Sequence, residues 1–416
     1  MKRIFGLLKT STLKDTLISF TGLGVTAILG FVFTIIMARV LGPVQYGVFS
    51  AVTALTSIVY NLGDLGVSSA LINFLPKLRE KRQVLIDSSF WFQILIAIFI
   101  LVLFLILSFF NNRIIPNSIP LYLILAGILS ASYLLVGFAQ GVFTAERRFW
   151  TFSISQIVDS GIKIILIFFF VSQTKLTITN ALIANIISSL IAFSLTFFKD
   201  LRSVEAKFDT GIFRKLFSFA KWIAISRVFS VMFSKIDIIL LNLLATSFDA
   251  GIFAAASRVT LLFALLVSSL NSVINPRFSG FDKKEKVISY IKKLSLFISG
   301  IALLMLICVF LAGPIITLVF GDKYLPAIPV FRWMTISMLP FLFSLITTPA
   351  ILYTYNKPDF FAKTTAFQVI TIIIMEIILI PRISYYAPVV AMGVTNVFVL
   401  IITAGKLRQL INSDEI

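Results

Sequence analysis

The sequence predicts an all-α integral membrane protein with about 12 transmembrane helices, arranged as two parallel-repeat six-helix lobes around a central cavity. Of the 416 residues, 59% are hydrophobic, and the mean hydropathy is +1.03. Soluble domains are closer to half apolar, so most of this chain's surface requires a bilayer as its solvent. Apolar windows of about 20 residues, the length of a membrane-crossing helix, recur along the chain. A similarity between its two halves completes the prediction.

The apolar windows predict twelve spans. They lie near 16–41, 44–73, 87–110, 120–144, 151–172, 180–198, 217–244, 249–275, 294–320, 327–353, 364–381 and 386–405. The loops between them are shorter than the ~40 residues below which a chain seldom has a core of its own. An even number of spans places both termini on the same side of the membrane.

The first two spans meet at a break, Leu41-Gly42-Pro43, and the second span carries a charge, Asp64, between Gly63 and Gly66. A charge in hydrocarbon is costly and is usually retained for function. The neighbouring glycines leave backbone accessible to a partner helix. We expect a structural role for Asp64 beside the break, with substrate contact as the alternative.

The basic residues gather on one side of the predicted membrane. They concentrate in the N-terminal tail, in the loops near 77–86, 146–150, 199–221, 276–293 and 355–363, and in the C-terminal tail. By the positive-inside rule, these loops and both termini are cytoplasmic in a multi-pass protein of the cell membrane. This topology accounts for the net charge of +18 without a nucleic-acid partner.

The lack of histidine and of a second cysteine limits which metal sites and disulfides the chain can form. The chain has no histidine, and Cys308 is its single cysteine. An intramolecular disulfide is therefore excluded, and the usual ligands for zinc are missing. We expect neither a metal site nor a cofactor.

The longest loop divides the chain into two halves. Residues 199–216 place Phe213 and Leu216 among basic residues, which favours an amphipathic helix on the inner leaflet. We therefore expect an N-terminal six-helix lobe at 1–198, a cytoplasmic linker at 199–216 and a C-terminal six-helix lobe at 217–416.

The halves share an opening motif. Residues 45–51, at the start of the second span, read QYGVFSA, and residues 249–255, at the start of the eighth, read DAGIFAA. Six spans separate the two motifs, so the repeats face the same way and are related by an axis along the membrane normal.

Three basic residues of the second half are candidates for binding an anionic substrate. Arg258 lies among alanines about ten residues into the eighth span, too deep to reach the interface easily by extending its side chain. Arginine offers a planar fork of donors to phosphate oxygens. The alternative is a buried ion pair with Asp237 or Glu376. Arg227 and Lys235 are about 80° apart around the seventh span, so both can face one cavity.

Other charges in the spans allow simpler interpretations. Asp237 is a partner for Lys235 or a cation ligand. Asp159 and Lys163 are spaced i, i+4 on the fifth span and can pair with each other. Glu376 lies in the middle of the eleventh span without an obvious charged neighbour on its own helix.

Three motifs carry a resemblance to a known family. They are ARVLGP at 38–43 with Tyr46-Gly47, Asp64-Leu65-Gly66, and GIF at 251–253 with Ala256-Ser257-Arg258. With the overall layout, they resemble the polysaccharide transporter (Wzx-type flippase) family of the multidrug/oligosaccharidyl-lipid/polysaccharide exporter superfamily. Lipid II flippases of this superfamily usually have an Arg-Asp pair shortly after a Leu-Gly-Phe in the first span. The pair is missing after Leu29-Gly30-Phe31, which argues against lipid II as the substrate.

The resemblance implies a flippase rather than an enzyme. It would move an undecaprenyl-pyrophosphate-linked oligosaccharide from the cytoplasmic to the outer leaflet by alternating access, with partners among polysaccharide-assembly membrane proteins. Relatives couple this movement to a Na⁺ or H⁺ gradient. Asp237 and Glu376 are candidates for the coupling ion, and Thr395 and Asn396 could join them.

Two alternatives remain open at this point. A drug or small-molecule exporter of the same superfamily would be expected to have an acidic cavity, whereas basic groups predominate within these spans. A membrane glycosyltransferase or polymerase acting on the same lipid carrier generally needs carboxylates in a sizeable extracytoplasmic loop. The expected outer loops hold only Asp249 and Asp322, both in short turns.

Overall fold

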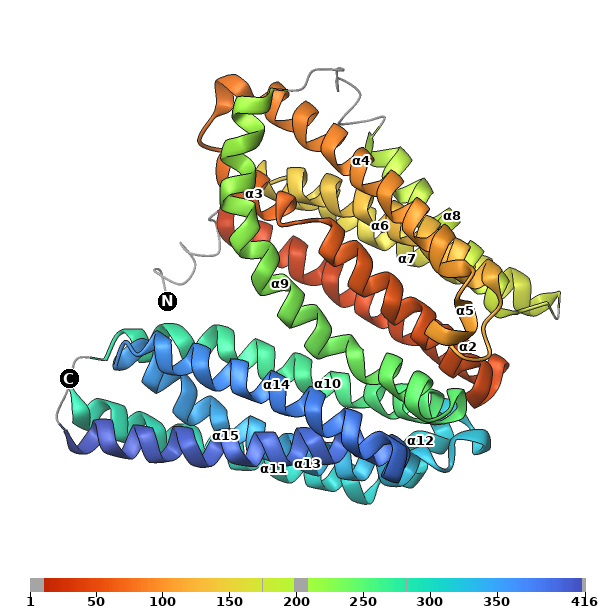
Figure 1. Ribbon diagram of the computed structural model, residues 1–416. Coiled ribbons are helices and arrows are strands. Elements are labelled where there is room, and N and C mark those ends of the chain that lie inside the picture. The colour runs from red at the N-terminus through yellow and green to blue at the C-terminus, as the bar shows by residue number, and fades with distance from the viewer. Residues whose placement is uncertain (1–10, 174, 198–208, 282, 414–416) are drawn as a thin grey trace. The chain divides into compact units, whose positions relative to one another are not determined.

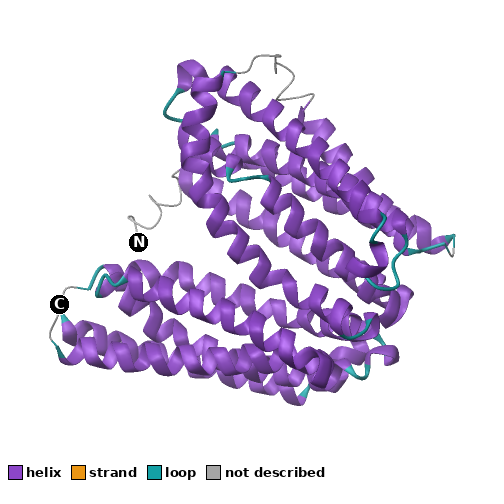
Figure 2. Ribbon diagram, in the orientation of Figure 1, coloured by secondary structure: helices purple, strands orange, loops and turns teal. Residues whose placement is uncertain are grey.

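The computed structural model describes residues 11–173, 175–197, 209–281 and 283–413. In this part of the chain every regular element is a helix, and short loops join them (Figure 1, Figure 2). Nine helical stretches here are long and apolar enough to cross a membrane. Two of them, Ile18–Gly63 and Pro358–Asn412, have 46 and 55 residues, enough for two crossings each at about 20 residues per crossing. With helix α9 added, they supply the expected number of spans, and the all-α membrane class is confirmed.

The contacts divide the chain into two compact units, one that extends to Ile239 and one that begins at Leu240. The helices of the first unit are α2 (Ser11–Gly63), α3 (Val67–Phe74), α4 (Arg82–Ser108), α5 (Asn111–Ile114), α6 (Pro120–Ala145), α7 (Phe149–Ser172), α8 (Ile178–Thr196) and α9 (Thr210–Leu244) as far as Ile239. A 3-10 turn, Arg79–Lys81, precedes α4. Residues 199–208 of the expected amphipathic linker lie outside the described residues, and its last residues open α9.

Helix α6 forms the centre of the first unit. It packs against α2, α3, α4, α7 and α8. Its Phe138 and Phe143 are fully buried in a core cluster with Leu71 of α3 and Ile86 of α4. A second cluster joins Ala70 of α3 and Leu85 of α4 to Leu216 and Ala220, and it anchors the start of α9 to this unit.

The second unit has the same kind of centre. Its helices are α10 (Ser247–Ser279), α11 (Lys284–Phe310), α12 (Ala312–Phe320), α13 (Ala327–Pro349), α14 (Pro358–Ile383) and α15 (Ala387–Asn412), with short turns at Asp322–Tyr324 and Ser384–Tyr386 and a π-helical continuation of α13 at Ala350–Thr354. Helix α13 packs against α10, α11, α12 and α15. The most apolar windows of α6 and of the α13 segment are each 56% buried, against 22% for α4 and for α11. The fourth span of each half is therefore well buried, and in the second unit α10, whose window is 61% buried, shares the interior with it.

The predicted break between the first two spans is present at Gly42. Its φ of 73° lies in the left-handed region, and two helices meet there within α2. Glycine adopts this conformation without steric cost, and Pro43 supplies no backbone N–H to continue the hydrogen bonding.

The helix is interrupted within the span expected near 44–73. Helix α2 ends at Gly63, and the chain turns at Leu65 (φ 45°) and Gly66 (φ 78°) before α3 begins at Val67. A Cβ added to Gly66 would lie 2.5 Å from the carbonyl oxygen of Ala220 in α9. Apolar length alone does not report this close approach of a distant helix, so the turn was not predicted from the sequence.

Two of the basic loops lie at the same end of the first unit. Arg82, at the start of α4, donates from Nε to Oε1 of Glu146 at 2.5 Å, directly after α6. Arg148 approaches the other carboxylate oxygen at 3.8 Å. The loops near 77–86 and 146–150 thus adjoin, as the charge-based topology requires.

The turn at Gly66 yields a stability prediction. Gly66→Ala places a side chain in a left-handed conformation, which costs about 1–2 kcal/mol, and drives it against the Ala220 carbonyl. We expect the apparent melting temperature of the detergent-solubilised protein, measured at one heating rate, to fall by several degrees. The matched control is Gly24→Ala in α2, where an added Cβ meets nothing within 4 Å. Equal melting temperatures for the two variants would contradict the packing described here.

Candidate functional site

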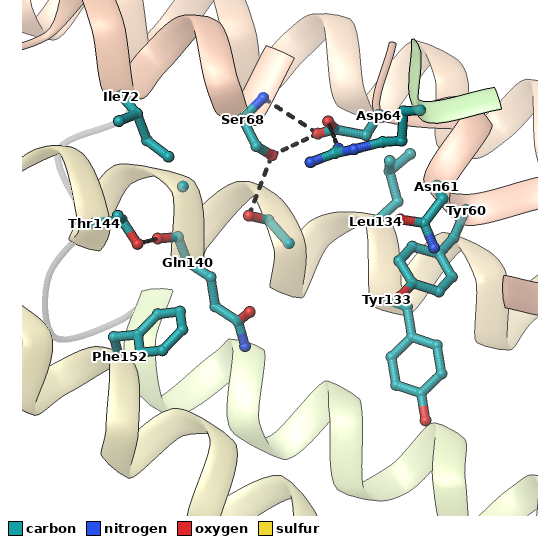
Figure 3. Close-up of a pocket in the computed structure, with 13 residues that line it drawn as sticks. Tyr60, Asn61, Asp64, Ser68, Ile72, Tyr133, Leu134, Gln140, Thr144 and Phe152 are labelled. Atoms are coloured by element: carbon teal, nitrogen blue, oxygen red, sulfur yellow. Dashed lines mark hydrogen bonds and ion pairs between the residues drawn. The ribbon is translucent and has the colours of Figure 1, made fainter. Parts of the chain in front are cut away.

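The break after α2 carries a charged site. The carboxylate of Asp64 forms an ion pair with the Nη1 of Arg227 from α9. Its Oδ1 also accepts hydrogen bonds from the backbone N–H of Ser68, at 3.2 Å, and from the Ser68 hydroxyl (Figure 3). Ser68 lies in the first turn of α3, where backbone N–H groups have no partner within the helix. Asp64 therefore receives a cation and helix-end donors together.

The backbone at the break is satisfied as well. The carbonyl of Asp64 accepts from the N–H of Val67 at 2.8 Å and from Nε2 of buried Gln93 in α4 at 3.4 Å. Polar backbone without partners is costly in a membrane interior, so these contacts allow the helix to break there.

The two side chains of the ion pair differ in their exposure to solvent. The side chain of Asp64 is 7% exposed, whereas that of Arg227 is 32% exposed. An incoming anion could thus reach the guanidinium while the carboxylate stays covered. Arginine has five N–H donors, so it can hold one carboxylate and still donate to a second acceptor.

Arg227 and Asp64 line a pocket of about 260 Å³ that lies wholly within the first unit (Figure 3). Its walls come from the end of α2, from α3, from α6, from the start of α7 and from α9. The lining residues are Tyr60, Asn61, Asp64, Ser68, Ile72, Tyr133, Leu134, Gly137, Gln140, Gly141, Thr144, Phe152 and Arg227.

Several neutral polar groups of this pocket are not engaged with the protein. Among the described residues, the hydroxyl of Tyr60, the amide oxygen of Asn61 and the side-chain amide of Gln140 have no hydrogen-bond partner. The Asn61 amide nitrogen donates to the carbonyl of Ser57 at 2.8 Å, which fixes the orientation of the side chain. The pocket thus presents donors and acceptors to a ligand.

A polar network lies behind one wall of the pocket. Lys163 pairs with Asp159 at 3.2 Å, the contact expected from their i, i+4 spacing, and donates to the hydroxyl of Tyr133 at 3.3 Å. That hydroxyl donates to Oδ1 of Asn185 at 3.2 Å, and Ser188 donates to Asp159 at 2.8 Å. The network satisfies the Lys163 charge and holds Tyr133 with its ring 5.5 Å from that of Tyr60.

Lys235 and Asp237 lie farther along α9 than Arg227. Both side chains are half-buried, and neither is among the residues that line the pocket. Of the expected cationic pair Arg227 and Lys235, only Arg227 lines the pocket.

Arg258 occupies α10 of the second unit. It is half-buried and follows three buried alanines, Ala254 to Ala256. Among the described residues of its own unit, its guanidinium makes no ion pair or hydrogen bond, so it is not paired with Glu376. Part of the surface of Arg258 is exposed.

Glu376 is fully buried in α14. The residues expected to join it have other contacts: Thr395 donates to the carbonyl of Ala391 at 2.8 Å, and Asn396 bridges Gln368 and the carbonyl of Ser337 at 2.8 and 2.9 Å. In the described part of the chain, no three His, Cys, Asp or Glu side chains gather as a metal site would need.

Neither the Asp64–Arg227 pair nor the neutral lining of the pocket was predicted from the sequence. The two charges are 163 positions apart in the chain, so no local spacing relates them. A usable signal existed for the lining, because Asn61, Tyr133 and Gln140 are polar interruptions of apolar windows. A polar side chain within a span usually faces the protein interior.

Solved structures share this fold. The lipid II flippase MurJ in an inward closed conformation matches with a TM-score of 0.74 and 16% identity, over 95% of this chain and 87% of that one. An inward-facing multidrug resistance MATE family transporter of the MOP superfamily matches with a TM-score of 0.73 and 15% identity, over 95% and 98%. The two-lobe membrane transporter fold is therefore confirmed.

Sequence relatives cover most of the chain. A putative O-antigen transporter of Shigella flexneri is 21% identical over 80% of this chain and 82% of its own length. A probable low-salt glycan biosynthesis flippase, Agl15, of Haloferax volcanii is 25% identical over 90% and 78%. The family model described as polysaccharide biosynthesis protein matches residues 12–282, well over half of the sequence, and this chain therefore belongs to that family.

Proposed function

We propose that this protein is a flippase that moves an undecaprenyl-pyrophosphate-linked oligosaccharide from the cytoplasmic to the outer leaflet by alternating access, for polysaccharide biosynthesis. No bond is made or broken in this process. The polar head group would enter a site with basic side chains while the prenyl chain stays in the lipid. A gradient-driven change of access would then release the head group on the other side.

The observation that carries the proposal is the half-buried Arg258. It lies within a membrane-spanning helix and has no ion-pair partner among the described residues of its unit. A charge at such a depth is costly, and a function that needs it explains why it is kept. The pyrophosphate of a lipid-linked sugar would supply the missing anion in bidentate geometry.

The relatives support a glycan carrier over the drug-exporter alternative. One is named an O-antigen transporter and another a glycan biosynthesis flippase. A MATE transporter shares the fold, but fold alone does not fix the cargo. In the pocket of the first unit the one carboxylate, Asp64, is already paired with Arg227.

The first prediction concerns transport. Purified protein in proteoliposomes should move a fluorescent undecaprenyl-pyrophosphate oligosaccharide between leaflets, and Arg258→Ala should slow this by about 10-fold or more, since contacts to charged groups contribute about 1.5–3 kcal/mol. The matched control is Arg382→Ala, an arginine at the end of α14. If wild-type protein moves no lipid-linked sugar, the flippase proposal fails. If Arg258→Ala transports at the wild-type rate, Arg258 is not the phosphate contact.

The second prediction separates phosphate binding by Arg227 from a purely structural ion pair. Asp64→Asn removes the competing carboxylate charge, so we expect it to lower the melting temperature yet tighten binding of farnesyl pyrophosphate by a few-fold. Arg227→Gln should lower stability and weaken that binding by about 10-fold or more. Isothermal titration calorimetry on the solubilised protein gives both affinities. Equal losses of affinity in the two variants would indicate that the pair serves packing only.

The third prediction concerns the coupling ion. We propose Glu376, with Asp237, as the acidic group that responds to the Na⁺ or H⁺ gradient, because a buried carboxylate in a span is a candidate for ion transfer. Glu376→Gln keeps the shape of the side chain but cannot ionise. Transport driven by an imposed gradient should fall to the rate seen without a gradient, while equilibrium binding of farnesyl pyrophosphate stays unchanged. Full gradient dependence in this variant would exclude Glu376.

A further inference from the structure

We infer that the pocket of the first unit is a carbohydrate subsite, which receives the sugar residue attached to the pyrophosphate while Arg227 contacts the phosphate. The inference rests on the proposed function and deepens it, because it assigns one ring of the cargo to named side chains. The proposed phosphate contact uses only a charged group of this pocket, and its neutral polar groups are free for another part of the cargo.

The size of the pocket suits a small polar group. Pockets that bind drug-sized ligands have volumes of about 300–1,000 Å³. At about 260 Å³, this pocket can accept a single sugar ring but not a whole oligosaccharide. The remaining sugars of the cargo would have to extend beyond it.

The lining is chemically matched to a sugar. Each hydroxyl of a sugar both donates and accepts a hydrogen bond, and so does the hydroxyl of Tyr60. The amide of Gln140 offers two donors and an acceptor, and Asn61 offers an acceptor. All three groups lack a hydrogen-bond partner among the described residues and line the same pocket. A bound sugar would satisfy them in place of water.

Aromatic faces complete the match. Tyr60, Tyr133 and Phe152 line the pocket, and Figure 3 shows Gln140 extending between Phe152 and the tyrosine pair. Aromatic rings present apolar faces that can pack on the C–H faces of a sugar, while tyrosine keeps a polar end for hydroxyls. The hydrogen bonds of Tyr133 to Lys163 and Asn185 hold its ring in place before any ligand arrives.

The Asp64–Arg227 pair determines where the phosphate of a bound sugar phosphate would lie. The Asp64–Arg227 pair belongs to the pocket wall, and only its cationic partner is substantially exposed. A phosphate attached to the sugar would therefore meet the guanidinium rather than the carboxylate. A purely apolar ligand would leave the neutral polar groups unsatisfied, which costs about 1–3 kcal/mol for each buried one.

Gly137 provides a way to fill the pocket without disturbing the helices. It lines the pocket from α6, and a Cβ added there meets nothing within 4 Å. Gly137→Leu should therefore occupy the space proposed for the sugar. The matched control is Gly300→Leu in α11, where an added Cβ also meets nothing within 4 Å and which is not among the lining residues.

The experiment compares binding of lipid-linked probes to the solubilised full chain. The probes are farnesyl pyrophosphate and its conjugates with glucose, galactose, N-acetylglucosamine or N-acetylgalactosamine; the corresponding free sugar 1-phosphates test whether the lipid is needed. Wild-type protein should bind at least one conjugate about 10-fold more tightly than farnesyl pyrophosphate, as expected from two or three added hydrogen bonds. Gly137→Leu should abolish this preference, whereas Gly300→Leu should keep both the preference and the wild-type affinity for farnesyl pyrophosphate.

A second variant tests the hydrogen bonds themselves. Gln140→Leu has nearly the same volume but no donors, so the preference for the conjugate should fall by about three- to tenfold with a wild-type melting temperature. The subsite is excluded if wild type prefers no conjugate, or if Gly137→Leu retains the preference. Those results leave the flippase proposal intact as long as wild type moves the undecaprenyl-linked substrate. If wild type moves none, the proposed function fails, whatever the binding shows.

Discussion

An ionised carboxylate is stable inside a membrane protein only if cations and hydrogen-bond donors surround it, and Asp64 obtains both from segments far apart in the chain. The guanidinium of Arg227 comes from α9, and the N–H and hydroxyl of Ser68 come from the first turn of α3. Breaking a buried pair by removing one partner typically costs about 3–5 kcal/mol. The pair therefore fixes three elements at once: the end of α2, the start of α3 and the middle of α9.

The same constraint produces the pocket. Helix α2 stops at Gly63 because the chain must turn for Asp64 to face α9, and Gly66 supplies the left-handed residue that lets the α9 backbone approach. An uninterrupted helix would have covered the space that the turn leaves beside α6. Tyr60 and Asn61 end α2 at the edge of this space, with Gly137 and Gln140 across from them on α6. The turn between α2 and α3 therefore both stabilises the fold and forms part of the pocket.

Local physics accounts for what the sequence predicted well. The break at Gly42 follows from the chemistry of glycine and proline in adjacent positions, and the Asp159–Lys163 pair follows from the pitch of one helix. The contact between Arg82 and Glu146 agrees with a topology derived from loop charge. The turn after Asp64 was not predicted, because an apolar window reports the hydrophobicity of a span and not whether its helix is continuous. The partner that makes the turn stable lies on α9, beyond the reach of any periodic pattern.

The sequence by itself determined the class of the protein. Apolar length sets the number of spans, because a helix of fixed rise must cross a bilayer of fixed thickness, and loop charge sets which loops lie together. Only the tertiary structure decided that Asp64 pairs with Arg227, that Arg258 has no ion-pair partner among the described residues of its unit, and that neutral side chains of α2 and α6 share a pocket. These relations depend on how helices distant in sequence pack side by side, and packing depends on shape complementarity along whole helix faces rather than on the composition of any one segment.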